Sequence, residues 1–328
     1  ARKLVAASTS GVDGIFSRQD TLARHVIRLA QCLFLGIALG LSPAANALNH
    51  WQDDQGQSWV VPKKLPTRWI VLGPHLVEMA EAIGAKQRIV GVQDDHPIPG
   101  RYEVSLSGHA VVGQSGSISE ERVRALRPDL VVFWAAGLSP VQQRRLQRLG
   151  IPLLAIAPKT LDDIPERLLW LGALSGLREN AQKLADSERA SLTKIRQNFA
   201  DGSRLRGFYQ VWQQPLYSLS RQNLVSQAMA VCGVDSIVPT GNIEAPIMNV
   251  EAVIAARTEI ILVGEDELVR ARGYWQRFST LPAVQRKAIV GVDDFALTRP
   301  GLSLLRAIPA LCQAVSPWRI RQSVPELQ

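Results

Sequence analysis

Few residues in this chain stand in a pattern that could perform catalysis. The stretch GQSGS, residues 113–117, approaches the G-x-S-x-G pattern of a nucleophilic serine but lacks the final glycine. The sequence contains no Walker loop, no dinucleotide-binding fingerprint and no metal-protease histidine pair. We therefore expect a protein that is not an enzyme, with an exported hydrolase as the alternative from another functional class.

The histidines argue against a metal site shared by two halves of the chain. Beyond residue 47 they are His50, His75, His96 and His109, and none follows residue 109. A zinc or manganese site between two lobes needs histidine and carboxylate ligands from both of them. We expect no bound metal ion and no cofactor.

The N-terminal region has the pattern of an export signal. Arg24 and Arg28 precede a largely apolar stretch of 13 residues, 29–41, and small residues follow at Ala45 and Ala47. We expect cleavage after Ala47 and a periplasmic protein. The alternative is retention as a membrane anchor, for which the apolar stretch is short of the roughly 20 residues that span a bilayer.

The net charge gives no sign of a nucleic-acid surface. The formal charge is +8, and it falls to +5 without residues 1–47, which contain five basic and two acidic residues. Arg144, Arg145 and Arg148 are not interleaved with aromatic residues, as they would be on a surface that binds nucleic acid. A solvated helix face explains them better.

Two cysteines remain after residues 1–47 are removed together with Cys32. An even number of cysteines in an oxidising compartment favours a bond between Cys232 and Cys312, and two unpaired buried thiols are the alternative. In the chain-entropy model, closing this loop would stabilise the fold by about 4–5 kcal/mol.

One pattern of 15 residues occurs twice, offset by 130 positions: SEERVRALRPDLVVF at 119–133 and NVEAVIAARTEIILV at 249–263. Each copy opens on a residue that caps helices, Ser119 or Asn249, and continues with apolar residues at helical spacing. Each copy then closes on a continuous apolar run of the kind found in buried strands. We predict a helix followed by a strand in both copies.

Strands and helices alternate around each copy of the repeat. The first set runs from RWIVLG (68–73) to IPLLAIAP (151–158), and the second from RGFYQVW (206–212) to KAIVGVDD (287–294). This order predicts an α/β fold of two Rossmann-like lobes with parallel sheets. Residues 178–199 contain no Gly or Pro and predict a rigid interlobe helix of about 33 Å. A ligand cleft is expected between the lobes, at the carboxyl ends of the strands.

These patterns also predict where the domains begin and end. The YWQRF segment, residues 274–278, is predicted to be a helix of the second set. The predicted divisions are a signal peptide (1–47), an N-terminal extension (48–66), an N-terminal lobe (67–161), a helical linker (162–204), a C-terminal lobe (205–318) and a tail (319–328).

Several segments in this order resemble a known family. RWIVLGPHLVEMAEAIGA, RVRALRPDLVVFW, QPLYSLSRQNLVSQAMAVCG and RPGLSLLRAIPALC resemble the periplasmic cobalamin-binding proteins of ABC importers, within the wider siderophore, haem and cobalamin receptor superfamily. The resemblance covers residues 67–316. It implies that Cys232 and Cys312 are bonded, that the ligand is cobalamin or a related corrinoid, and that the partner is the permease dimer of an ABC transporter. We expect a monomer.

The resemblance also implies a docking role for two acidic residues. Family members meet arginines of the permease through one exposed glutamate per lobe, and the matching positions here are Glu121 and Glu251. Two pseudo-symmetric lobes can present equivalent charges to a two-fold symmetric partner. The alternative is that each glutamate only complements the dipole of the helix it begins.

For the ligand pocket, the resemblance implies Trp134, Tyr217 and Asp293, which stand at or just after predicted strand ends. A corrinoid has broad apolar faces and amide edges, so aromatic walls with a few polar groups suit it. Core packing is the alternative role for each aromatic residue.

Other pocket positions depart from the family pattern. Asp95, Ser115 and Ala245 stand where aromatic residues are expected, and we retain Asp95 as a ligand-binding candidate. Trp212 is the candidate to replace part of the missing aromatic surface.

The alternative ligands within the same superfamily are siderophores and haem. Haem receptors commonly place a tyrosine near the position of Gln114, which disfavours haem. His75 and His96, in loops after strands, could contact the edge of a ligand or the axial position of a cobalt atom, with an ordinary surface role as the alternative.

Overall fold

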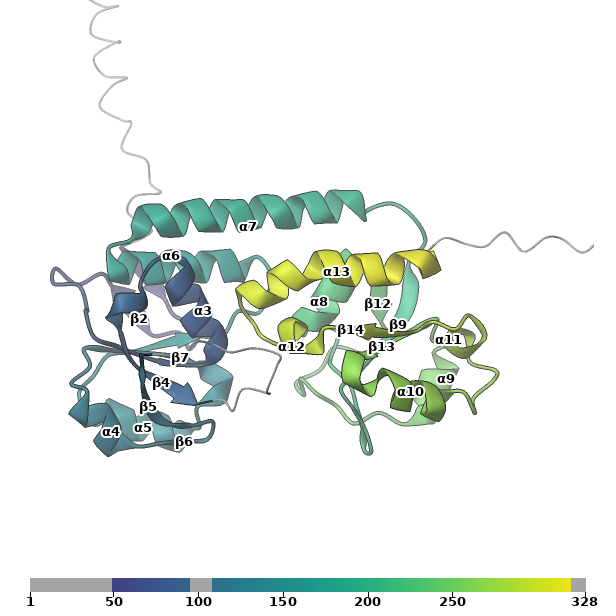
Figure 1. Cartoon of the computed structure of the whole chain (residues 1–328), viewed down its shortest axis with the longest axis horizontal. Helices are drawn as coiled ribbons and strands as arrows, with labels where there is room; N and C mark the ends of the chain where they lie inside the picture. The colour runs from purple at the N-terminus through teal and green to yellow at the C-terminus, as the bar shows by residue number, and fades with distance from the viewer. Residues whose placement is uncertain (1–48, 95–107, 320–328) are drawn as a thin grey trace, which may run out of the picture. The chain divides into compact units, whose positions relative to one another are not determined.

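The computed structural model describes residues 49–94 and 108–319, and within them two separate sheets carry helices, as predicted for two α/β lobes (Figure 1). The sheet of the first lobe has the strand order β6-β5-β4-β3-β7-β8, and every neighbouring pair is parallel except β5 with β6. Its strands are β3 (Trp69–Leu72), β4 (Ile89–Asp94), β5 (Ala110–Gln114), β6 (Ser117–Ile118), β7 (Leu130–Trp134) and β8 (Leu153–Ile156).

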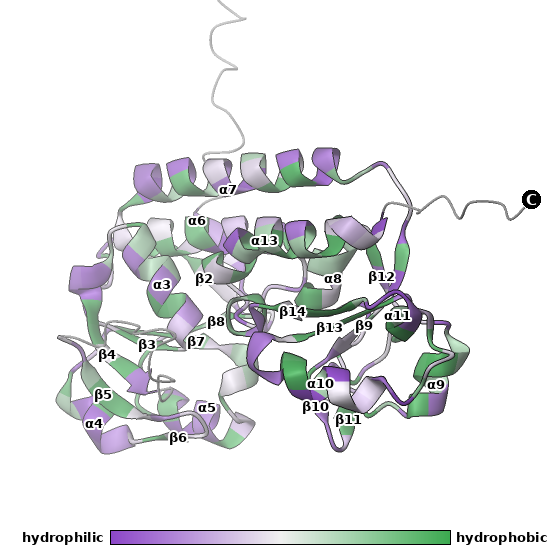
Figure 2. Ribbon diagram, turned by 45° about the vertical axis from the view of Figure 1, so that its right-hand side comes forward, coloured by the Kyte–Doolittle hydropathy of each residue, from purple (hydrophilic) through white to green (hydrophobic). Residues whose placement is uncertain are grey.

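The sheet of the second lobe repeats the central part of the first one. Its order is β12-β9-β13-β14, all parallel. In the first lobe, β3 pairs with β4 on one side and with β7, the strand of the 15-residue repeat, on the other. In the second lobe, β9 pairs in the same way with β12 and with β13, the strand of the second copy of the repeat. Figure 2 shows β13 and β14 as hydrophobic, which suits strands covered on both faces. The strands are β9 (Leu205–Gln210), β12 (Val234–Ser236), β13 (Ile260–Gly264) and β14 (Ile289–Val292).

The helices follow the predicted alternation. In the first lobe they are α3 (Pro74–Ala82), η1 (Lys86–Arg88), α4 (Glu120–Ala125), η2 (Ala135–Gly137) and α5 (Pro140–Gln147). In the second they are α8 (Leu224–Val231), α9 (Val250–Ala255), η3 (Glu265–Glu267), α10 (Leu268–Trp275), α11 (Pro282–Gln285), α12 (Asp294–Leu297) and α13 (Leu302–Arg319). Across residues 49–94 and 108–319, no helix combines the length and apolar character needed to cross a membrane. The predicted signal peptide lies outside these residues.

The predicted YWQRF helix has the wrong boundaries. Helix α10 begins at Leu268 and ends at Trp275, so only its last two residues belong to that segment. The helix faces the core with Ala271 and Trp275, four positions apart, and the indole of Trp275 donates to Gln210 Oε1 at 2.7 Å. The periodicity that defines α10 therefore precedes the aromatic cluster.

Both copies of the 15-residue repeat form the predicted helix and strand, in different sheets. The Ser119 hydroxyl accepts from the N–H of Arg122 at 3.3 Å, and Asn249 Oδ1 accepts from the N–H of Ala252 at 2.8 Å, so both predicted caps are confirmed. The helices are α4 and α9, and the strands are β7 and β13.

The acidic residue of each repeat fixes the neighbouring strand. Asp129 accepts from the N–H of Arg68 at 2.8 Å, just before β3, and Glu259 accepts from the N–H of Arg206 at 3.0 Å in β9. In return, Arg68 and Arg206 each donate to backbone carbonyls at the end of the repeated helix. The repeat is thus a unit that positions the central strand of its lobe.

The predicted long interlobe helix is present, and it packs against a second helix. Helices α6 (Asp163–Ser175) and α7 (Arg178–Asn198) form an antiparallel pair joined through Gly176, whose φ of 75° is the left-handed conformation that glycine adopts easily (Figure 1). The 21 residues of α7 span about 32 Å. A Cβ on Gly172 would lie 2.3 Å from the Cβ of Ala181, so glycine is what lets the two helices approach.

Helix α13 is a third connection between the lobes. It packs on α8 of the second lobe, on α7, and on α3 of the first lobe. Ser303 Oγ donates to Glu78 of α3 at 2.6 Å, and Arg306 lies 3.1 Å from Glu188 of α7. The lobes are therefore held by packed helices with polar cross-links.

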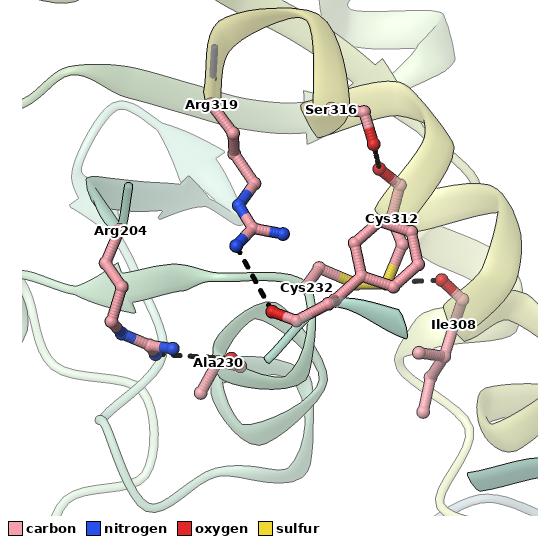
Figure 3. The surroundings of a disulfide bond; sticks show 8 residues. Arg204, Ala230, Cys232, Ile308, Cys312, Ser316 and Arg319 are labelled. Atoms are coloured by element: carbon pink, nitrogen blue, oxygen red, sulfur yellow. Dashed lines mark hydrogen bonds between the residues drawn. A yellow bond between two sulfur atoms is a disulfide. The ribbon is translucent and has the colours of Figure 1, made fainter. Parts of the chain in front are cut away.

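A disulfide attaches α13 to the second lobe. Cys312 of α13 is bonded to Cys232 at the end of α8, with a Cα–Cα distance of 4.7 Å and both residues fully buried (Figure 3). The carbonyl of Cys312 accepts a hydrogen bond from the hydroxyl of Ser316 at 2.7 Å. The bond joins residues 80 positions apart, as the resemblance implied.

The segment before the first lobe forms the hairpin β1 (His50–Gln52) and β2 (Ser58–Val60), which packs on α6. The Trp51 ring stacks on Trp59 at 6.3 Å and on Trp170 of α6 at 5.9 Å. Asp54 receives two hydrogen bonds from Arg167, at 2.6 and 2.9 Å, and one at 2.6 Å from the backbone just after β8. This hairpin holds the end of β8 in place.

Candidate ligand-binding site

Two adjoining cavities lie between the lobes. The larger has a volume of about 640 Å³, within the range of about 300–1,000 Å³ that is usual for ligand pockets. The first lobe lines it with the ends of β7 and β8, and the second with the start of α8 and the connection from α12 to α13. Its lining residues include Trp134, Pro158, Lys159, Leu219, Gln222 and Glu244.

The smaller cavity, about 190 Å³, shares Trp134, Thr298 and Pro300 with the larger one. Its other walls are the segment after β3, Gln93 at the end of β4, and Ser115 after β5. Both cavities therefore lie at the carboxyl ends of parallel strands of the first lobe, as expected for α/β folds. Together they form what we call the interlobe cleft.

Trp134 stands at the junction of the two cavities. It is the last residue of β7, where the strand leaves the sheet, and it is half-buried. A Cβ on Gly137 would lie 2.9 Å from Trp134 Cε3, so this glycine leaves room for the indole. Trp134 provides the cleft with the broad aromatic surface that a flat apolar ligand needs.

His75 lies next to Trp134 and lines the smaller cavity. The two rings meet edge to face, with centroids 5.5 Å apart and planes at 88°. Burial, together with the positive charge of Arg299, lowers the pKa of His75 to about 3. The imidazole is therefore neutral at physiological pH.

Polar groups gather at the rim of the larger cavity. Gln227 of α8 donates to the carbonyl of Lys159 in the first lobe at 2.7 Å and to the carbonyl of Gln222 in the second at 2.8 Å. It also accepts from the N–H of Leu161 at 3.3 Å. Gln227 thus ties the two lobes together beside the cavity, while Lys159 and Glu244 provide charges at its wall.

Of the five predicted ligand-binding residues, Trp134 lines both cavities. Tyr217 lies in the hairpin β10 (Trp212–Gln213) and β11 (Leu216–Tyr217), where Trp212 is 53% exposed and donates to the carbonyl of Gln214. Asp293 is exposed and caps α12 by accepting from the N–H of Ala296 at 3.0 Å. These three residues line neither cavity, and Asp95 lies outside the described residues. Their roles in binding stay predictions.

The two predicted docking glutamates occupy equivalent places in the lobes. Glu121 and Glu251 are each the second residue of a repeated helix, α4 or α9, and both are exposed. Within the part of the chain that the structure describes, neither forms an ion pair. Their surface position suits contact with a partner, and their docking role stays a prediction.

Other cleft residues were not anticipated from the sequence. Arg299 and its neighbours enter through the connection between α12 and α13, and Lys159 enters just after β8. The position of Lys159 after a predicted strand could have indicated it. No local pattern marks the α12–α13 connection, because it reaches the cleft only through the packing of α13 on the first lobe.

The comparison with known proteins assigns the chain to a family. The model of the family described as "Periplasmic binding protein" matches residues 70–307, which include both sheets almost completely. The chain belongs to this family of periplasmic binding proteins. A cleft between two lobes agrees with a binding protein of this family.

Among periplasmic binding proteins, the chain is similar to several whose ligand is known. It is 28% identical over 292 residues to a vitamin B12-binding protein of Vibrio cholerae, covering 88% of this chain and 96% of the relative. It is 28% identical over 268 residues to a vitamin B12-binding protein of Pectobacterium atrosepticum, covering 79% and 92%.

Solved structures of periplasmic binding proteins agree. The periplasmic vitamin B12 binding protein BtuF of Vibrio cholerae superposes with a TM-score of 0.69 at 26% identity, covering 77% of this chain and 98% of BtuF. The periplasmic heme-binding protein RhuT from Roseiflexus sp. RS-1 superposes with a TM-score of 0.65 at 20% identity, covering 77% and 99%. The second likeness shows the shared fold alone.

Proposed function

We propose that this chain is a periplasmic receptor that captures cobalamin or a related corrinoid in the interlobe cleft and delivers it to the permease of an ABC importer. The observation that carries the proposal is the cleft with Trp134 at its centre, in a fold whose relatives at 28% identity are vitamin B12-binding proteins. In this role the protein binds its ligand and releases it.

The composition of the cleft supports a large, mostly apolar ligand with polar edges. Trp134, Leu219, Leu297 and Pro300 give the larger cavity apolar walls, and amides and charges stand at its rim. This combination suits a corrin ring edged with amide side chains. The predicted roles of Tyr217, Trp212, Asp293 and Asp95 belong to this proposal as further contacts around the ring.

The test compares two half-buried tryptophans. Trp134→Ala removes the wall shared by both cavities and should weaken cyanocobalamin binding by about tenfold or more, since the loss of a large buried aromatic contact commonly exceeds ~1.4 kcal/mol. Trp318→Ala is the control, because Trp318 lies in α13 and lines neither cavity. Equal affinities of the two variants and the wild type would contradict binding in this cleft.

Delivery to the permease is tested at the two equivalent glutamates. We expect Glu121→Arg/Glu251→Arg to retain corrinoid binding and lose uptake in cells, because charge pairs fix the register of a docked complex. Glu120→Arg, which changes the neighbouring, partly exposed charge of α4, is the control. Unchanged uptake with the double variant would refute the docking role.

Export is part of the same proposal. The N-terminal pattern at residues 1–47 supports secretion to the periplasm, with cleavage after Ala47. Mass spectrometry of the protein isolated from the periplasm should find Leu48 at its N-terminus. A protein that keeps the first 47 residues in the membrane fraction would contradict cleavage.

A further inference from the structure

Among the described residues that line the larger cavity, Lys159 and Glu244 are the two that carry a charge. Lys159 follows β8 of the first lobe, and Glu244 lies between β12 and α9 of the second lobe. Both residues are exposed, and neither forms an ion pair within residues 49–94 and 108–319. In a pocket with mostly apolar walls, such charged groups orient the ligand and determine specificity.

Hydrogen bonds hold the backbone of Lys159 from both lobes. Its N–H donates to Asp163 Oδ2 at 2.8 Å, and its carbonyl accepts from the side-chain amide of Gln227 at 2.7 Å. Asp163 begins α6, and Gln227 lies on α8 of the second lobe. The backbone of Lys159 is therefore fixed beside the cavity, while its flexible four-carbon stem lets the ammonium reach a group at the cavity mouth.

The nearby carboxylate of Asp163 is engaged by other groups. It accepts from the N–H groups of Lys159 and Thr160, at 2.8 and 2.9 Å, and lies 3.8 Å from the guanidinium of Arg167. In the part of the chain that the structure describes, it forms no ion pair with the ammonium of Lys159. The positive charge of Lys159 is therefore available to a negatively charged group of the ligand.

Corrinoids differ from one another in the charge that they carry beside the ring. The arms of cobinamide end in neutral amides and a hydroxyl group. Cobalamin carries in addition a nucleotide, which is joined through a phosphodiester with a negative charge at neutral pH. Lysine binds phosphate groups as a point charge that donates to their oxygens. The phosphodiester is therefore the group of a cobalamin that Lys159 is suited to bind.

We propose that Lys159 binds the phosphodiester of the bound corrinoid, so that the receptor selects complete cobalamins over cobinamides. The inference rests on the proposed function and names the ligand more closely. The corrin ring packs against Trp134, and its nucleotide extends toward Lys159 at the mouth of the larger cavity. Glu244, on the wall that the second lobe provides, accepts hydrogen bonds from the amide arms of the ring.

The experiment titrates the chain from residue 48 with cyanocobalamin and with dicyanocobinamide, in a buffer without phosphate, and follows tryptophan fluorescence. We expect cyanocobalamin to bind about tenfold more tightly or better, since a hydrogen bond to a charged group contributes ~1.4 kcal/mol or more. This preference should decrease as the salt concentration rises, because salt screens exposed charges. Equal affinities for the two corrinoids at low salt would overturn the proposal and leave the proposed function intact.

The variants separate recognition of the phosphodiester from the rest of the site. Lys159→Gln should reduce the preference for cyanocobalamin to about twofold or less and leave the affinity for dicyanocobinamide unchanged, whereas Lys159→Arg should keep the preference. A structural role of Lys159 would instead lower both affinities alike and would overturn the proposal.

Lys183→Gln is the matched control. It removes the same charge from the exposed surface of α7, where Lys183 pairs with Glu179 and lines neither cavity. A preference that persists in Lys159→Gln, or that is lost equally in Lys183→Gln, would overturn the assignment to Lys159. Failure of the wild-type protein to bind either corrinoid would instead refute the proposed function.

Discussion

The buried imidazole of His75 makes the stability of the protein depend on pH in a specific way. Its pKa is about 3 in the folded state and 6.5 when exposed, because burial and the charge of Arg299 both disfavour the protonated ring. Above pH 6.5 the ring is neutral in both states and contributes no pH dependence. As the pH falls below 6.5, the unfolded chain gains a proton that the folded chain does not, and the free energy of unfolding decreases. The decrease continues until the folded state also takes up the proton, near pH 3.

The magnitude at pH 5 follows from the distance to the unfolded pKa. One pH unit corresponds to ~1.4 kcal/mol, so His75 alone should lower the free energy of unfolding by about 2 kcal/mol between pH 7.5 and pH 5. Any pKa below about 4 in the folded state gives the same loss of unfolding free energy, so this loss does not depend on how far burial lowers the pKa of His75.

The assay is urea unfolding at pH 7.5, 6 and 5, with wild type, His75→Gln and the exposed-histidine control His50→Gln. The wild-type protein and the control should lose about 2 kcal/mol more than His75→Gln over this range. Subtracting the unfolding free energies of the proteins from one another removes the contribution of the carboxylates, because these groups titrate in all three proteins. Identical pH dependence in wild type and His75→Gln would refute the reasoning that His75 is buried in its neutral form.

Three further predictions concern the parts that hold the cleft. Replacing the disulfide with Cys232→Ala/Cys312→Ala should lower the free energy of unfolding by about 4 kcal/mol in urea, because the 80-residue separation is large, and a loss below about 1 kcal/mol would contradict this. Arg167→Met should lower the free energy of unfolding by about 3–5 kcal/mol, because it leaves the buried Asp54 without its ion-pair partner. In a double-mutant cycle, Asp54→Leu/Arg167→Met should recover most of this loss, and no recovery would show that the two residues are not coupled. Gly172→Ala should lower the thermal midpoint and reduce the free energy of unfolding by about 1–3 kcal/mol, because the new methyl group would lie 2.3 Å from a side chain of α7. An unchanged midpoint would show that α6 and α7 can move apart without loss of stability.

The lobes could be predicted because local sequence patterns indicate their strands and helices. Continuous apolar runs placed β7 and β13, and capping residues placed the start of α4 and α9. The roles of Asp129 and Glu259 could not be read from the repeat, because each bonds a backbone segment more than 50 residues away. The start of α10 was also missed, because the predicted helix was placed on the aromatic residues at the end of α10.

The cleft was only partly predictable for a related reason. Trp134 could be proposed because it matches a pocket position of the family that the sequence resembles, and because it ends a strand, the edge at which parallel sheets bind ligands. The walls formed by Lys159 and Arg299 depend on how α8 and α13 pack against the first lobe. No short-range pattern encodes that packing. The partners of His75 likewise come from β7 and from the start of α13, far along the chain.

The central claim is that one corrinoid binds between the lobes. Isothermal titration of the chain from residue 48 with cyanocobalamin, and separately with hemin, tests it most directly. We predict saturable binding of one cyanocobalamin per chain and no saturable binding of hemin. Saturation by hemin without any heat from cyanocobalamin would contradict the account.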